Sequence, residues 1–177
     1  LIQWAGDNPD REGLLETPKR VVNAYKEFFA GYDSKPEQVL SKTFDEVEGY
    51  DEMVIVRDIA IESHCEHHMV PFIGIAHIGY IPNKRIVGIS KLARIADVFA
   101  KRLQTQETMT AQIADTINEV LKPKGVAVVI DAQHQCMTTR GTHKSESSTI
   151  TSRMLGLFRT NSNTRNEFMN LINSANK

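Results

Sequence analysis

The chain has 177 residues and a formal net charge of −1, and 41% of its residues are hydrophobic. This length suits one domain with an appendage and is enough to bury a hydrophobic core. The near-zero charge gives no global field that would attract nucleic acid or an acidic membrane, and no apolar run reaches the length of a membrane span. We therefore expect a globular protein of the cytoplasm that binds neither nucleic acid nor a membrane.

The N-terminal part of the chain predicts helices. Thr17 followed by Pro18 is a typical helix start, with Thr17 as N-cap and Pro18 at the first helical position. Apolar residues then recur at helical spacing, and Gly31 can end the helix. A second short helix is expected around Val39 and Leu40. The apolar positions of the first helix are Val21, Val22, Tyr25, Phe28 and Phe29.

From residue 51 onwards the pattern predicts strands and helices in the order β-β-α-α-β-β-α. The expected strands are 53–61, 72–81, 126–130 and 148–155, and the expected helix starts are Ser90, Thr105 and the capping box Thr164 with Glu167. Two hairpin-like pairs flanking two helices favour an α+β domain, with an antiparallel four-stranded sheet and helices on one face. The sequence thus divides into an N-terminal helical segment, 1–50, and one domain, 51–177.

The two cysteines of the chain both lie beside histidines. Thiolate and imidazole are the ligands that zinc prefers, and Cys65 and His68 are close enough in sequence to bind one ion from a single turn. Cys136 would be the third ligand, leaving one tetrahedral position for water, as in catalytic zinc sites. A fourth ligand from His64 or His67 would instead close the site. A disulfide is the other alternative, which a reducing compartment disfavours.

Four motifs in this order resemble the GTP cyclohydrolase I family, and the resemblance extends from residues 17–20 to the C-terminal helix. It implies the tunnelling fold, in which sheets from several subunits join into a barrel, and a homodecamer of paired rings. It also implies hydrolysis of GTP to 7,8-dihydroneopterin triphosphate and formate, the first step of tetrahydrofolate and pterin biosynthesis. The motifs are Cys65-Glu66-His67-His68, Gly88-Ile89-Ser90-Lys91-Leu92-Ala93-Arg94, Gln104-Thr105-Gln106-Glu107, and His134-Gln135-Cys136 with Arg140-Gly141.

The same resemblance implies one zinc ion per subunit, bound by Cys65, His68 and Cys136, that activates water for attack on C8 of guanine. His134 would be the general acid that protonates N7, because an imidazole titrates near neutral pH. In an extended segment His134 and Cys136 would point to the same side. His67 would assist proton transfer.

Substrate contacts are also implied by the resemblance. Glu107 would read guanine, because a carboxylate accepts from N1–H and the 2-amino group together, and Gln106 would lie beside it. Ser90 would contact the ribose, or simply cap a helix. No Walker-type sequence occurs, which suits chemistry on the base with the triphosphate left intact. The residues expected to bind the triphosphate are Lys91, Arg94, Arg140 and, with a smaller contribution, Arg20.

Two other functions fit the same sequence. A tunnelling-fold relative such as a nitrile reductase would use a cysteine nucleophile and a nicotinamide cofactor, and tightly bound zinc that protects both cysteines would count against it. A non-catalytic zinc or nucleotide-binding scaffold would bind GTP without releasing formate. The native metal also stays open, because manganese or iron can occupy a site of cysteine and histidine when zinc is scarce.

Overall fold

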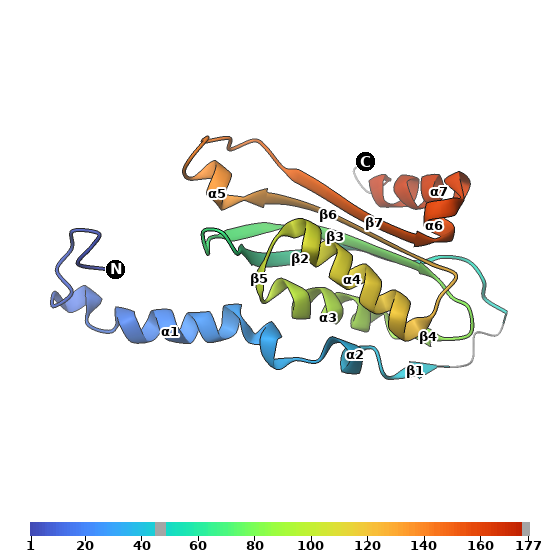
Figure 1. Cartoon of the computed structure of the whole chain (residues 1–177), viewed down its shortest axis with the longest axis horizontal. Coiled ribbons are helices and arrows are strands. Elements are labelled where there is room, and N and C mark those ends of the chain that lie inside the picture. The colour runs from blue at the N-terminus through green and yellow to red at the C-terminus, as the bar shows by residue number, and fades with distance from the viewer. Residues whose placement is uncertain (45–48, 175–177) are drawn as a thin grey trace.

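The computed structural model describes residues 1–44 and 49–174, and a five-stranded sheet forms the centre of this part of the chain (Figure 1). In sheet order its strands are β5 (Leu103–Gln104), β2 (Val54–Cys65), β3 (Pro71–Ile81), β6 (Gly125–His134) and β7 (Thr149–Gly156). The four long strands pair antiparallel, as predicted. The short β5 adds a parallel edge next to β2. A separate two-stranded pair joins β1 (Thr43–Phe44) to β4 (Ile86–Val87).

The helices follow the predicted order. They are α1 (Thr17–Phe28), α2 (Pro36–Val39), α3 (Ile89–Ala100), α4 (Gln106–Leu121), α5 (Gln135–Thr138), α6 (Leu157–Thr160) and α7 (Ser162–Asn173), with 3₁₀ turns η1 (Glu12–Leu14) and η2 (Ala30–Asp33). Thr105 caps α4 as predicted, because its side chain accepts a hydrogen bond from the Thr108 N–H. Among the described helices none has both the length and the apolar character that a membrane crossing needs.

Three predicted N-caps lie inside their helices instead. α1 begins at Thr17 itself, and Ser90 is the second residue of α3, which Gly88 precedes as the cap. Thr164 was expected to start the C-terminal helix, but the cap is Asn161, whose side chain accepts from the backbone N–H groups of residues 163 and 164. Asparagine is among the strongest N-cap residues, and Asn161 has the extended backbone that a cap requires.

Helices cover both faces of the sheet, although only one covered face was predicted. α3 and α4 pack on the first face, where Val128 of β6 belongs to the main hydrophobic core. α7 packs on one end of the second face, and its Phe168 and Ile172 form a smaller core with Ala127 and Val129 of β6. Alternate residues of a strand point to opposite faces, so β6 supplies both cores. The terminal helix takes the second face because its own apolar stripe also needs burial.

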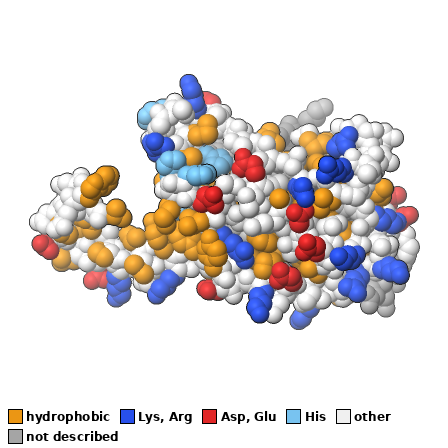
Figure 2. All heavy atoms as spheres, viewed as in Figure 1, with side chains coloured by type: hydrophobic (Ala, Val, Ile, Leu, Met, Phe, Trp, Pro, Cys, Tyr) orange, Lys and Arg blue, Asp and Glu red, His pale blue; other side chains and the backbone are white. Residues whose placement is uncertain are grey.

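The N-terminal helix is amphipathic as predicted, but in a single chain its apolar side is uncovered. α1 extends away from the sheet and contains no buried residue (Figure 1). Val22 is 57% exposed and Phe28 is 40% exposed. Hydrophobic side chains gather along α1 and where it meets the sheet (Figure 2). The division of the chain at residue 50 stays a prediction.

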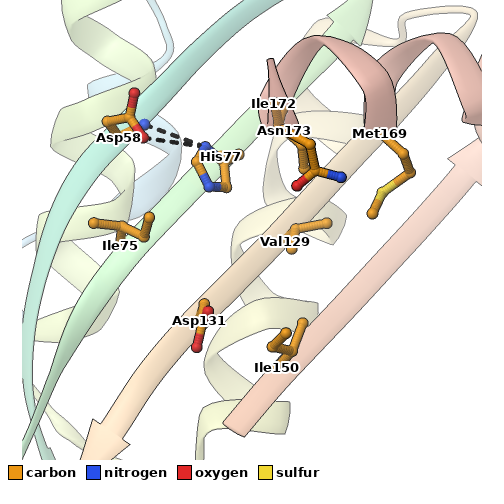
Figure 3. A pocket seen from close by; sticks show the side chains of 9 residues that line it. All are labelled: Asp58, Ile75, His77, Val129, Asp131, Ile150, Met169, Ile172 and Asn173. Carbon is orange, nitrogen blue, oxygen red and sulfur yellow. Dashed lines mark hydrogen bonds and ion pairs between the residues drawn. The ribbon is translucent and has the colours of Figure 1, made fainter. Parts of the chain in front are cut away.

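A buried histidine lies beside an irregularity in β2. The register between β2 and β3 shifts between Val56 and Ile59, and Asp58 at this bulge has a left-handed backbone with φ of 57°. His77 is 7% exposed, and its Nδ1 accepts a hydrogen bond from the Asp58 backbone N–H at 3.2 Å (Figure 3). Burial lowers the pKa of His77, and the nearby Asp58 carboxylate only partly opposes this effect. His77 is therefore neutral in the folded protein at neutral pH.

We expect the free energy of unfolding to decrease as the pH falls below about 6.5, the ordinary pKa of histidine. In that range the unfolded chain takes up a proton at His77 that the folded chain accepts only at lower pH, so protonation favours unfolding. His77→Gln keeps an acceptor for the Asp58 N–H but does not titrate. Urea unfolding at pH 7.5 and pH 5.5 should therefore show a smaller pH effect in this variant. An equal decrease in both proteins would contradict the prediction.

Candidate metal centre and catalytic pocket

Cys65, His68 and Cys136 come together at one end of the sheet. Their potential ligand atoms all lie within 4.8 Å of one another, and Cys65 Sγ is 3.9 Å from His68 Nδ1. Cys65 is the last residue of β2, His68 lies in the turn that follows, and Cys136 comes from α5. Within the described part of the chain no other cluster of three such side chains could hold a metal ion.

The turn after β2 explains why Cys65 and His68 face each other. The Met69 N–H donates to the Cys65 carbonyl at 2.9 Å, and the Cys65 N–H donates to the Val70 carbonyl at 3.0 Å. Met69 has a φ of 53°, which lets the chain reverse within a few residues. The Glu66 N–H donates to the Gln104 carbonyl at 3.0 Å and so attaches this turn to β5. The hairpin itself therefore brings His68 next to Cys65.

The third ligand candidate reaches the cluster differently from the prediction. The extended-segment argument for His134 and Cys136 is wrong, because β6 ends at His134 and Cys136 lies in the helical turn α5. This turn brings its Sγ into the cluster with Cys65. Burial raises the pKa of the Cys136 thiol, and the neighbouring Cys65 adds to the effect. A cation favours the thiolate and offsets both effects, so the donor set of two thiols and one imidazole fits zinc.

The fold excludes His64 as a ligand to this cluster. His64 and Cys65 are adjacent in β2, so their side chains point to opposite faces of the sheet. The His64 ring packs against Phe28, with ring centroids 4.6 Å apart, and against Phe29 at 5.4 Å. Burial lowers the pKa of His64, which keeps the ring neutral. The other candidate for a fourth ligand, His67, lines the adjacent pocket and is outside the cluster of possible ligands.

A pocket of about 450 Å³ opens beside the cluster. This volume is in the range of small-molecule sites. Figure 2 shows histidine side chains gathered at this end of the molecule. The lining residues come from the ends of β2 and β6, the turn after β2, β5, α5, β7, and the N-cap and first turn of α4: Cys65, His67, Gln104, Thr105, Gln106, Glu107, His134, Cys136, Met137 and Thr149.

The ring of His134 is held on two sides. It stacks on the fully buried Phe72, with centroids 4.6 Å apart and an interplanar angle of 9°, because the two residues are partners across β3 and β6. On its edge, His134 Nε2 lies 2.7 Å from Gln106 Oε1. Burial lowers the pKa of His134, and the negative charge of Glu107 partly opposes this. The pocket therefore presents an oriented imidazole whose protonation responds to nearby negative charge.

Gln106 lines the pocket, but its side chain already forms hydrogen bonds within the protein. It is 1% exposed, and its Nε2 donates to the carbonyls of Ile130 at 3.0 Å and Thr149 at 2.8 Å. Nε2 also lies 3.1 Å from Thr151 Oγ1. The predicted direct contact of Gln106 with substrate stays a prediction. Its observed partners are two backbone carbonyls, the Thr151 hydroxyl and the ring of His134.

The predicted triphosphate cluster is not assembled within one chain. Arg140 lies at the site, where its Nη1 donates to His68 Nε2 at 3.3 Å and to the Cys136 carbonyl at 3.4 Å. α3 begins after β4 and ends before β5, so its first turns lie away from the pocket (Figure 1). The predicted contacts that do not line the pocket are Ser90, Lys91 and Arg94 of α3, Arg20 of α1, and Arg140 itself, which reaches the cluster from outside the lining.

Sequence reasoning missed the residues that support His134. Phe72 was placed in a strand by its apolar pattern, but its contact with His134 depends on the pairing register of β3 with β6. Thr110 of α4 and Thr151 of β7 meet with their Oγ1 atoms 2.7 Å apart. No local signal marks this pair, because the two threonines come from different elements.

Two comparisons of the sequence with known proteins agree on one family. Residues 1–173 match the family model of GTP cyclohydrolase I. The protein named GTP cyclohydrolase 1 of Maricaulis maris is 58% identical over 175 residues, covering 99% of this chain and 85% of that protein. The protein of the same name from Hyphomonas neptunium is 60% identical over 171 residues, covering 97% of this chain and 83% of that protein. A solved structure, the archaeosine synthase QueF-Like in the apo form, has a TM-score of 0.47 at 13% identity and covers 59% of this chain and 93% of its own.

Proposed function

This chain belongs to the GTP cyclohydrolase I family, and from that premise we propose that the pocket beside Cys65, His68 and Cys136 is its active site, with zinc as the metal. The chain is an enzyme that converts GTP to 7,8-dihydroneopterin triphosphate and formate, a hydrolase of folate and pterin biosynthesis. One observation carries the assignment of the site: two thiols and an imidazole converge within 4.8 Å at a pocket that also holds His134 and Glu107.

The donor set supports zinc over harder cations, because thiolates and imidazole favour zinc whereas magnesium and calcium prefer oxygen. When bound, zinc supplies Lewis-acid chemistry that lowers the pKa of water towards neutrality. Cys65, His68 and Cys136 would hold it, and three protein ligands are the number typical of catalytic zinc. His64 cannot supply a fourth, since it packs against phenylalanine rings on the other side of β2.

His134 is proposed as the general acid for N7 of guanine, with His67 in a supporting role in proton transfer. The stacked Phe72 ring and the hydrogen bond to Gln106 hold the imidazole in one orientation, which favours proton transfer to a fixed position. Negative charge beside a histidine favours its protonated form. Glu107 supplies such a charge, and a bound triphosphate would add to it.

Glu107 is proposed as the reader of the guanine edge. It lies in the first turn of α4 and lines the pocket beside His134. Its carboxylate can accept hydrogen bonds from N1–H and the 2-amino group at once, and adenine presents neither donor in this arrangement. A site built to pair with those donors rejects a base that lacks them, because the carboxylate would be left unpaired.

We further propose a homo-oligomer, a decamer as in the family, in which neighbouring chains complete each pocket. The uncovered apolar side of α1 supports an assembly, since Val22 and Phe28 would otherwise remain in water. The position of Ser90, Lys91 and Arg94 away from the pocket of their own chain supports shared sites. The cytoplasm is the proposed location, because a reducing compartment keeps both free cysteines available for metal.

Zinc-loaded protein incubated with GTP should release formate together with a product that fluoresces as neopterin after oxidation. ATP should release no formate, because adenine cannot pair with Glu107 as proposed. Sedimentation should place the activity with an oligomer. Activity at monomer mass would contradict the shared pocket. GTP binding without release of formate would indicate the scaffold alternative. Turnover that depends on a nicotinamide cofactor would indicate the nitrile reductase alternative.

A further inference from the structure

A buried chain of hydrogen bonds behind His134 constrains where its ring carries a proton. Gln106 Nε2 faces two backbone carbonyls, those of Ile130 and Thr149, and carbonyls only accept. The amide nitrogen must therefore point at them, which leaves Gln106 Oε1 towards His134 Nε2 at 2.7 Å. An amide oxygen only accepts, so the hydrogen in this contact belongs to His134 Nε2.

Two threonines prevent the reversed amide orientation. The Thr110 hydroxyl donates to the Gln106 backbone carbonyl at 2.7 Å, so it can only accept from Thr151 Oγ1, which lies 2.7 Å away. The Thr151 hydroxyl hydrogen is thereby used, and its oxygen is available to accept from Gln106 Nε2 at 3.1 Å. A reversed Gln106 would place its oxygen against three acceptors in a buried site, and buried polar groups left without a hydrogen-bond partner destabilise the folded state.

We propose that Gln106, through Thr110 and Thr151, is a positioning residue that holds neutral His134 in the Nε2–H tautomer, so that Nδ1 is the ring nitrogen left for substrate. Among the described residues no partner is found for Nδ1, and the ring lines the pocket.

This inference rests on the proposed role of His134 as general acid, but it differs from the expected role of Gln106 as a substrate contact. A direct contact that binds substrate and transition state equally would raise KM for GTP and leave the tautomer unchanged when Gln106 is replaced. A positioning residue would instead lower kcat and change the ring signature of His134. The two roles therefore separate in kinetics and in spectroscopy.

The first test is solid-state ¹⁵N NMR of the zinc-loaded oligomer, with ¹⁵N in the histidine rings and at a pH where the His134 ring is neutral. The His134 signals are those that a His134→Gln sample lacks. We expect a protonated Nε2 and an unprotonated Nδ1 at His134. A protonated Nδ1 would overturn the inference. This readout needs no turnover, so it stands even if the assay for formate fails.

The second test compares Gln106→Met with Gln133→Met. Gln133 precedes His134 in β6 and is exposed on the other side of the strand, so its variant should match the parent in both measurements. Gln106→Met should lower kcat by about 10- to 100-fold with little change in KM, and should give His134 signals from both tautomers. A raised KM with an unchanged tautomer would show that Gln106 contacts substrate instead. If Gln106→Met does not fold, the tautomer of the parent decides the question.

Discussion

Replacing Cys136 by serine should remove the bound metal and reduce the release of formate from GTP by at least about 10³-fold. Cys136 is one of two thiols in the cluster, and serine keeps its shape but is a poor ligand for zinc. Cys136 is only partly buried, so this change disturbs the fold less than a change at the buried Cys65. Metal content per chain after gel filtration and the rate of formate release measure the two effects.

Thr139→Ser is the matched control for this prediction. Thr139 follows α5 directly, and its hydroxyl donates to the Gln135 carbonyl at 2.7 Å, a bond that serine can also make. The control should retain one metal ion per chain and the parental rate. Stoichiometric zinc in the Cys136→Ser protein would show that Cys136 is not a ligand and would contradict the proposed site.

Replacing His134 by glutamine should lower kcat by about 10²- to 10⁴-fold, the usual contribution of a general acid. Glutamine can occupy the space between Phe72 and Gln106 but does not titrate in this range. Zinc content should stay at the parental level, because His134 is outside the cluster of possible ligands. Steady-state kinetics of formate release and metal analysis on the same sample separate the loss of proton transfer from the loss of metal.

His77→Gln is the control for this second variant, because it makes the same substitution on the neighbouring strand. His77 lies on the second face of the sheet, where it contacts Asp58 and lines a different, smaller pocket (Figure 3). It is not among the residues that line the pocket beside the metal cluster. The His77→Gln variant should have the same kcat as the parent. Parental kcat in His134→Gln would exclude the general-acid role, and loss of zinc from that variant would move His134 into the metal site.

Local patterns were sufficient for the long elements. Runs rich in β-branched and apolar residues predicted all four long strands. Helical spacing predicted α1, α3 and α4, and a capping box predicted α7. The caps were less predictable, because several neighbouring residues can each cap a helix and the backbone conformation selects among them. Asn161 rather than Thr164 caps α7 for this reason. The second covered face was also missed, since the side to which a terminal helix returns depends on contacts far along the chain.

By itself, the sequence determined the chemistry of the site. Residue type decides what a side chain can bind, so two cysteines beside histidines predicted a metal cluster, and the cluster forms from Cys65, His68 and Cys136. Only the tertiary structure decided whether a further histidine, such as His64, joins it. Side chains alternate between the two faces of β2, so His64 points away from Cys65 and packs against Phe28 of α1 and Phe29 at its C-cap. The hairpin turn, in contrast, brings His68 back to Cys65.

The tertiary structure also decided what surrounds His134. Phe72, Gln106 and Thr151 come from three elements that are distant in sequence. Phe72 and Gln106 contact His134, and Thr151 contacts Gln106, so these contacts depend on the register of β3, β6 and β7 and on the packing of α4. Periodicity in a sequence describes one element at a time and carries no information about such pairings. A hydrogen-bond network that orients a proton donor is therefore visible only once the elements are packed.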